Sequence, residues 1–98
     1  MTIEKKINND ALTLIVSGRL DTQTAPELEK EIDSSLSGVT ELIIDMTNLE
    51  YVSSAGLRVM LKAQKVMNTQ GSMMLTGVNE CIMEVFDITG FLDILTIQ

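Results

Sequence analysis

The chain has 98 residues, of which 45% are hydrophobic and only 3% aromatic, so we expect one domain over residues 1–98 with a single core of Leu, Ile, Val and Met. Its formal net charge of −7 disfavours binding to nucleic acid or to an anionic membrane surface, and no cluster of Lys or Arg contradicts this. A basic protein partner is compatible with the same charge.

The composition also disfavours metal sites and the common nucleophilic mechanisms. The sequence has no His and one cysteine, Cys81, which leaves no ligand set for zinc and no residues for a Ser-His-Asp or Cys-His arrangement. A lone cysteine cannot form an intrachain disulfide, which suits a reducing compartment. No apolar stretch of a signal peptide follows residues 2–6, and no apolar run is long enough to span a membrane. We therefore expect a cytoplasmic protein without a cofactor.

The start of the chain predicts a β-hairpin followed by a loop. Residues 3–7 and 11–17 have the composition of strands, and Asn8-Asn9-Asp10 between them is typical of a tight turn. Alternate residues of the second strand are apolar, which predicts one strongly buried face made of Leu12, Leu14 and Val16. Gly18 is expected to break this strand, so residues 19–23 should form a polar loop.

A helix is predicted next. Thr24 and Glu27 have the spacing of a capping box, and Pro26 is tolerated in a first turn. Gly38 should end the helix, whose buried stripe is predicted to be Leu28, Ile32 and Leu36. This stripe is flanked by an acidic run of Glu27, Glu29, Glu31 and Asp33. The run indicates either a solvated face or a surface that docks to a basic patch on a partner, and the residues leave both interpretations open.

The middle of the chain predicts a strand and a second helix. Residues 41–46 are apolar at consecutive positions, which predicts a strand buried on both faces, as in a parallel sheet. Residues 54–68 are apolar at helical spacing. One flank of this helix should carry a basic stripe formed by Arg58, Lys62 and Lys65.

The last third of the chain predicts two short strands around a third helix. Residues 72–76 have the composition of a strand, and Asn79 is expected to cap the helix that follows. Cys81 is expected to pack in the core rather than to act as a reactive thiol. Gly90 should turn the chain into a final strand at residues 94–97.

This alternation of strands and helices predicts an α/β fold. The opening hairpin adds an antiparallel pairing, so we expect a mixed but mostly parallel sheet of about five strands with three helices. Loops at residues 18–23, 47–54 and 77–79 should gather at the carboxyl ends of the strands. They contain no phosphate-binding glycine pattern and no nucleophile elbow, and no spacing shows Asp21 and Asp45 to be a pair. The residues give no support for an enzyme.

Residues 45–57 cross one strand–loop–helix junction and read DMTNLEYVSSAGL. This stretch resembles the signature of STAS domains, as found in bacterial anti-sigma factor antagonists. The resemblance covers nearly the whole chain, including the opening hairpin and the predicted order of elements. In the phosphorylatable antagonists the pattern is aromatic-aliphatic-Asp-Ser-Ser/Thr-Gly-Leu. When the two are matched on Gly56, the phosphoacceptor falls on Ser54, and Ser53 stands where the family has Asp.

The resemblance implies an anti-sigma factor antagonist that binds a GHKL-type anti-sigma factor kinase and releases a sigma factor. The kinase would phosphorylate Ser54 and switch the antagonist off, and a PP2C-type phosphatase would reverse this. The partner-binding surface that the resemblance implies comprises Asp21, Thr22, Ser53, Ser54, Gly56 and Arg58. From the residues alone, Ser53 and Ser54 are also good candidates for a helix cap.

Two other classes of function stay open. The first is a non-switching STAS adaptor subunit of a larger complex, such as a lipid-transport ABC system, and the sequence from Ser54 to Leu57 fits that role too. The second is an enzyme or a nucleotide-binding protein, although the sequence has no phosphate cradle.

Overall fold

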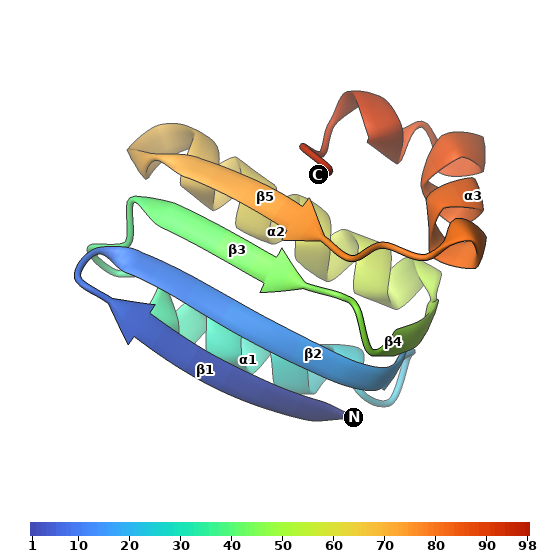
Figure 1. Cartoon of the computed structure of the whole chain (residues 1–98), viewed down its shortest axis with the longest axis horizontal. Helices are drawn as coiled ribbons and strands as arrows, with labels where there is room; N and C mark the ends of the chain where they lie inside the picture. The colour runs from blue at the N-terminus through green and yellow to red at the C-terminus, as the bar shows by residue number, and fades with distance from the viewer.

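The protein has an α/β fold in which one mixed sheet packs against helices. A computed structural model describes all 98 residues. The sheet has five strands, in the order β1-β2-β3-β5 with β4 paired to β2. The elements are β1 (Thr2–Asn8), β2 (Ala11–Leu20), α1 (Ala25–Ser35), β3 (Glu41–Asp45), β4 (Leu49–Val52), α2 (Ser54–Gln70), β5 (Ser72–Thr76), α3 (Glu80–Thr89) and the 3-10 helix η1 (Phe91–Asp93) (Figure 1). The predicted fold class is confirmed.

The strand pairings follow from the lengths of the connections. Strands β1 and β2 are antiparallel, and their tight turn contains Asn9 at a φ of 59°, a conformation that Asn tolerates better than most residues. The pairs β2–β3, β2–β4 and β3–β5 are parallel. Helices α1 and α2 provide the crossovers that parallel neighbours need. The sheet is therefore mixed and mostly parallel, as predicted.

Helices α1 and α2 lie against the same face of the sheet (Figure 1). In β2 and β3, alternate residues are fully buried, whereas Ile15 and Ile43 between them are only half-buried. The expectation that residues 41–46 are buried on both faces is therefore wrong. The reason is that neither crossover helix covers the second face, so that face of the sheet stays partly open.

The core lies between this sheet and the helices. It contains the predicted alternate face of β2 and the predicted stripe of α1. Met60 and Met67 of α2 are also fully buried. Phe86 of α3 has no exposed surface, so the core is not limited to the four aliphatic residue types that the composition predicts.

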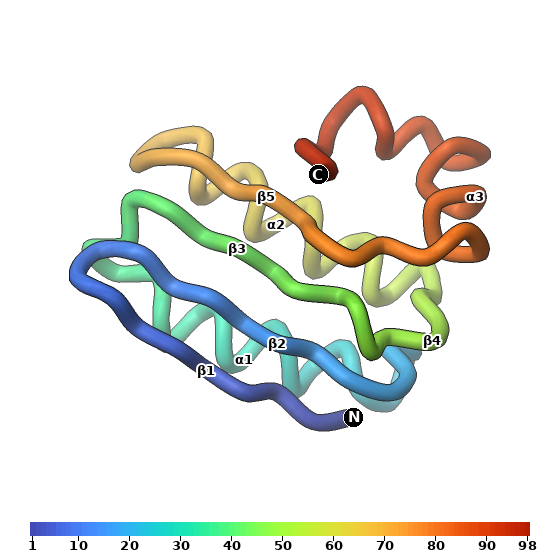
Figure 2. Tube along the Cα trace, viewed as in Figure 1, coloured from blue at the N-terminus to red at the C-terminus, as the bar shows by residue number.

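The carboxyl end of β2 differs from the prediction. Gly18 adopts a φ of 97° but does not break the strand, which continues to Leu20 through an irregularity between Gly18 and Arg19. Beyond that point β2 pairs with β4, so Leu49–Val52 is a strand rather than part of a loop. Figure 2 shows the two backbones side by side at this end of the sheet. The pairing joins residues far apart in sequence, and local composition does not reveal it.

The first helix lacks the predicted capping box. Thr24 has helical backbone angles and makes no side-chain cap bond. Its hydroxyl instead donates to the carbonyl of Arg19 at 2.7 Å and accepts from the N–H of Asp21 at 2.9 Å. The helix also ends at Ser35, before the expected Gly38. The Thr24 hydroxyl thus closes the preceding loop. Because it is occupied there, it does not cap the helix.

The third helix has the predicted cap at Asn79, but Cys81 is not part of its buried face. The Asn79 side chain accepts from the N–H of Ile82 at 2.9 Å, and Gly90 ends the helix in the left-handed conformation. Ile82 and Phe86 face the core, which places Cys81 outward, so the prediction of a buried Cys81 is wrong. The predicted last strand is reduced to one bridge between Leu75 and Ile97.

Candidate functional site

The loops that follow β2, β3 and β5 meet at the carboxyl end of the sheet, as predicted. The N–H of Ser53 donates to the carbonyl of Leu20 at 2.8 Å, which ties the start of α2 to the end of β2. The side chain of Asn79 donates to the carbonyl of Leu49 at 3.0 Å and thereby joins the third loop to β4. Backbone bonds therefore hold this end of the sheet, and the start of α2 lies at its centre.

The two adjacent serines have different environments. Ser53 is the N-cap of α2, with extended backbone angles, and its Oγ accepts from the N–H of Gly56 at 3.3 Å. Ser54 is the first residue of the helix, is exposed, and its hydroxyl has no hydrogen-bond partner. The hydroxyl that matches the family's acceptor position is thus free, while its neighbour serves the helix.

We expect Ser53→Ala to lower the free energy of unfolding by about 1 kcal/mol, because the first turn of α2 loses its side-chain acceptor. Urea unfolding of the two proteins would measure the difference. The matched control is Ser54→Ala, which removes an unpaired, exposed hydroxyl and should change stability by less than about 0.5 kcal/mol. A larger loss in Ser54→Ala than in Ser53→Ala would contradict this assignment of the cap.

Gly56 lies beneath the surface. A Cβ on Gly56 would stand 2.7 Å from Cγ of Leu20 and 3.2 Å from its carbonyl oxygen. The absence of a side chain therefore lets the first turn of α2 lie directly against the end of β2. Gly56 is buried, and its contribution to the site is to set how closely the N-terminus of α2 approaches β2.

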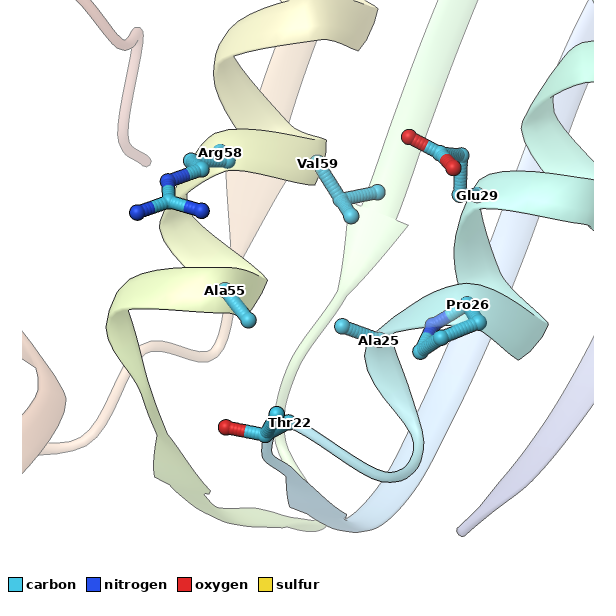
Figure 3. Close-up of a pocket in the computed structure, with 7 residues that line it drawn as sticks. All are labelled: Thr22, Ala25, Pro26, Glu29, Ala55, Arg58 and Val59. Atoms are coloured by element: carbon cyan, nitrogen blue, oxygen red, sulfur yellow. The ribbon is translucent and has the colours of Figure 1, made fainter.

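A groove separates the first turns of α1 and α2. Its volume is about 190 Å³, and its lining residues are Thr22, Ala25, Pro26, Glu29, Ala55, Arg58 and Val59. Figure 3 shows Ala25 and Ala55 facing one another across it, with the Arg58 side chain on the outer side of α2. The groove thus contains two of the predicted partner-binding residues, Thr22 and Arg58. The small residues were missed in the sequence, although Ala at the first turn of two adjacent helices permits their close approach.

Asp21 organises the loop between β2 and α1. Its Oδ1 accepts from the N–H groups of Gln23 and Thr24, each at 3.0 Å, and from the Thr24 hydroxyl at 3.2 Å. These bonds, chiefly the one from the Thr24 backbone, lower the pKa of Asp21. The carboxylate therefore stays charged at neutral pH and fixes the loop that holds Thr22.

Asp45 serves a separate turn. Its Oδ1 accepts from the Thr47 hydroxyl at 2.7 Å and from the Thr47 N–H at 3.0 Å, and the hydroxyl bond is the main cause that lowers the pKa of Asp45. Asp21 and Asp45 share no bonding partner. Each carboxylate is engaged by its own loop, so the two do not form a pair for acid–base chemistry.

Arg19 and Tyr51 form a second exposed feature beside the α2 N-terminus. They are register partners in β2 and β4, and the Arg19 guanidinium lies 4.4 Å from the centroid of the Tyr51 ring. This distance is within the range of a cation–π contact. The aromatic residue of the signature stretch is thus held on the surface with a positive charge over it.

The acidic run of α1 is largely paired within the molecule. Lys62 of α2 lies 3.1 Å from Asp33 and 3.5 Å from Glu29, and the bond to Asp33 is the main cause that raises the pKa of Lys62. Lys5 of β1 lies 3.5 Å from Glu31. Exposed pairs of this kind contribute little stability. They nevertheless favour the interpretation of the run as a solvated face over that of a docking surface.

The family model of the STAS domain matches residues 2–98, and the chain belongs to this family. The chain is 32% identical over 97 residues to the anti-sigma-B factor antagonist of Listeria monocytogenes, which covers 96% of this chain and 84% of that protein. It is 30% identical over 100 residues to the anti-sigma-B factor antagonist of Staphylococcus epidermidis, covering 100% of this chain and 93% of that protein.

Solved structures of anti-sigma factor antagonists have the same fold. A structure from Mycobacterium paratuberculosis has a TM-score of 0.88 at 21% identity, over 98% of this chain and 83% of that one. Unphosphorylated SpoIIAA has a TM-score of 0.78 at 15% identity, over 99% of this chain and 87% of that one. Phosphorylated Bacillus SpoIIAA has a TM-score of 0.77 at 16% identity, over 99% and 91%. None of the helices in the present chain is long and apolar enough to cross a membrane.

Proposed function

We propose that this protein is an anti-sigma factor antagonist that binds an anti-sigma factor and so releases a sigma factor. The names of relatives that are at least 30% identical over nearly the whole chain support this role. The observation that carries the proposal is the position of Ser54, whose free hydroxyl is exposed at the first turn of a helix of 17 residues. A hydroxyl in this position is open to a kinase and to a binding partner alike.

The finer proposal is a switch at Ser54. A GHKL-type anti-sigma factor kinase phosphorylates Ser54, and a PP2C-type phosphatase removes the phosphate. Phosphorylation adds roughly −1.5 to −2 charges. The fold tolerates this charge because Ser54 stands at a helix N-terminus and Arg58 follows one turn later on the same side.

The switch works by charge and by blocking the surface, with little refolding. This is supported by the position of Ser54, which is exposed at a helix N-terminus, where a phosphate is favourably placed without rearrangement of the fold. The partner-binding surface of the proposal is the rim around Ser54, with Gly56 beneath it. Its members are Asp21, Thr22, Ser53, Ser54 and Arg58.

One observation favours a second candidate function. Ser53 stands where the phosphorylatable antagonists have Asp, so the negative neighbour of the acceptor is missing. This is compatible with a non-switching STAS adaptor that stays bound to a larger complex, such as a lipid-transport ABC system. The same rim would then serve permanent binding.

Incubation of the purified protein with ATP and a GHKL-type anti-sigma factor kinase from the same organism tests the switch. Site-resolved mass spectrometry should find phosphate on Ser54. Ser54→Ala should abolish the modification, and Ser53→Ala should retain it as the matched control. Absence of phosphate from Ser54 in the unaltered protein would overturn the switch and leave the adaptor.

A further inference from the structure

The segment that contains α3 and η1 exposes three large apolar side chains. Ile88 is 78% exposed, Leu92 39% and Ile94 46%, all within seven residues of the chain. Single exposed apolar residues are common on protein surfaces, whereas several in one short segment are typical of an interaction site. We call the exposed residues of 80–94 the acidic-apolar surface.

The charge of this surface has one sign. Lys65 is the last basic residue of the chain, so residues 66–98 contain Glu80, Glu84, Asp87 and Asp93 without any Lys or Arg. All four carboxylates are exposed, and none forms an ion pair. This differs from α1, where lysines of neighbouring elements pair most of the acidic side chains.

Helix geometry brings the two kinds of residue together. In α3, Glu80, Glu84 and Ile88 follow one another at intervals of four residues and so share the outward face, and Asp87, three residues after Glu84, is exposed beside them. The opposite side of the helix is anchored in the core by Ile82 and Phe86. The exposed apolar residues therefore belong to a well-packed helix.

The orientation of η1 is also defined. The N–H of Asp93 donates to the carbonyl of Gly90 at 3.3 Å, and Leu95 just beyond η1 is buried. Figure 1 shows α3 at the end of the sheet at which β4 lies, and the chain after α3 turning back beside β5. The acidic-apolar surface is formed by elements other than α1 and α2. Those two helices line the groove described above, and Ser54 begins α2.

We propose that the acidic-apolar surface binds a second partner, which presents a basic amphipathic segment of another protein. The apolar residues of the segment would cover Ile88 and Leu92, and its Lys or Arg side chains would pair with the surrounding carboxylates. Pairing of this surface with the same surface of a second copy does not fit, because it would bring like charges together. Nucleic acid and anionic membranes are disfavoured by the same negative charge.

The test uses a 14-residue amphipathic helical peptide of Leu and Lys as the probe. Titration into the ¹⁵N-labelled full chain should shift amide signals within residues 80–94. A peptide of the same length with Glu in place of Lys should not bind. Ser54→Asp should leave the affinity for the Lys peptide unchanged, which separates this surface from the proposed switch.

Variants of the surface provide the decisive comparison. Ile88→Ser with Leu92→Ser should weaken peptide binding by roughly tenfold, and Glu84→Lys with Asp87→Lys should abolish it. The matched control is Ile7→Ser, which removes an isoleucine that is 69% exposed on β1 and should leave the affinity unchanged. The variants change only exposed side chains, and circular dichroism would verify their fold.

Three outcomes would overturn the proposal. The first is a pattern of shifts that extends equally over the acidic run of α1, which would indicate unspecific attraction of a cation. The second is unchanged affinity in both double variants. The third is self-association of the chain, detected by sedimentation, that Ile88→Ser with Leu92→Ser removes, because this would assign the surface to a second copy.

Discussion

Ser54→Asp is expected to weaken binding to the anti-sigma factor on the order of 100-fold, as measured by isothermal titration calorimetry. The hydroxyl of Ser54 is exposed at the centre of the proposed rim, so binding would bury a new carboxylate there without a partner. The chain already has a net charge of −7, so the added negative charge also increases the repulsion between this chain and acidic groups of the partner.

The matched control for this charge is Ser54→Asn, which has nearly the shape of Asp without its charge. It should bind within a fewfold of the unaltered protein, which would assign the effect to charge rather than to size. Asp is favourable in the first turn of a helix by roughly 0.3–1 kcal/mol, so Ser54→Asp should not lower the thermal stability. Equal binding of Ser54→Asp and the unaltered protein would disprove the electrostatic switch.

Gly77→Ala is expected to lower the free energy of unfolding by roughly 2–5 kcal/mol in urea denaturation. Gly77 has a φ of 67°, which is unfavourable for residues with a Cβ. In addition, a Cβ here would collide with Oγ1 of Thr47 and lie 2.9 Å from its Cα. The backbone cannot yield easily, because Thr47 is held by the carboxylate of Asp45.

Gly38→Ala separates the two causes of that loss. Gly38 has a φ of 78°, and a Cβ there would meet no atom within 4 Å. Gly38→Ala should therefore lower the free energy of unfolding only by the cost of the left-handed backbone conformation, about 1–2 kcal/mol. If both variants lost the same stability, the close approach of the loops after β3 and β5 would not be the cause.

Features that depend on local periodicity could be predicted from the sequence. The alternate apolar residues of β2 and the fourfold spacing along α1 identify the buried faces directly, because side-chain direction follows from strand and helix geometry. The turn at Asn9 and the caps at Asn79 and Gly90 follow from backbone preferences of single residues. The gathering of three loops at one end follows from parallel connections.

Features that depend on distant partners could not be predicted in this way. Strand β4 exists only because β2 continues beyond Gly18 to pair with it, and its four residues have no strong alternation. Thr24 has the composition of a cap, but a carbonyl of β2 lies within reach of its hydroxyl. The orientation of Cys81 depends on which side of the short helix α3 faces the core, and a helix of 10 residues has too few apolar positions to define that side. In the site, the same limit applies to the groove, which arises between two helices.

The division of labour between Ser53 and Ser54 has an evolutionary consequence. Asp caps a helix about as well as Ser, so an exchange between the two at position 53 preserves the start of α2. The same exchange adds or removes one negative charge directly beside the acceptor hydroxyl. Selection for a particular kinase can therefore change position 53 without opposition from the fold, while Gly56, which lies against Leu20, has no such freedom.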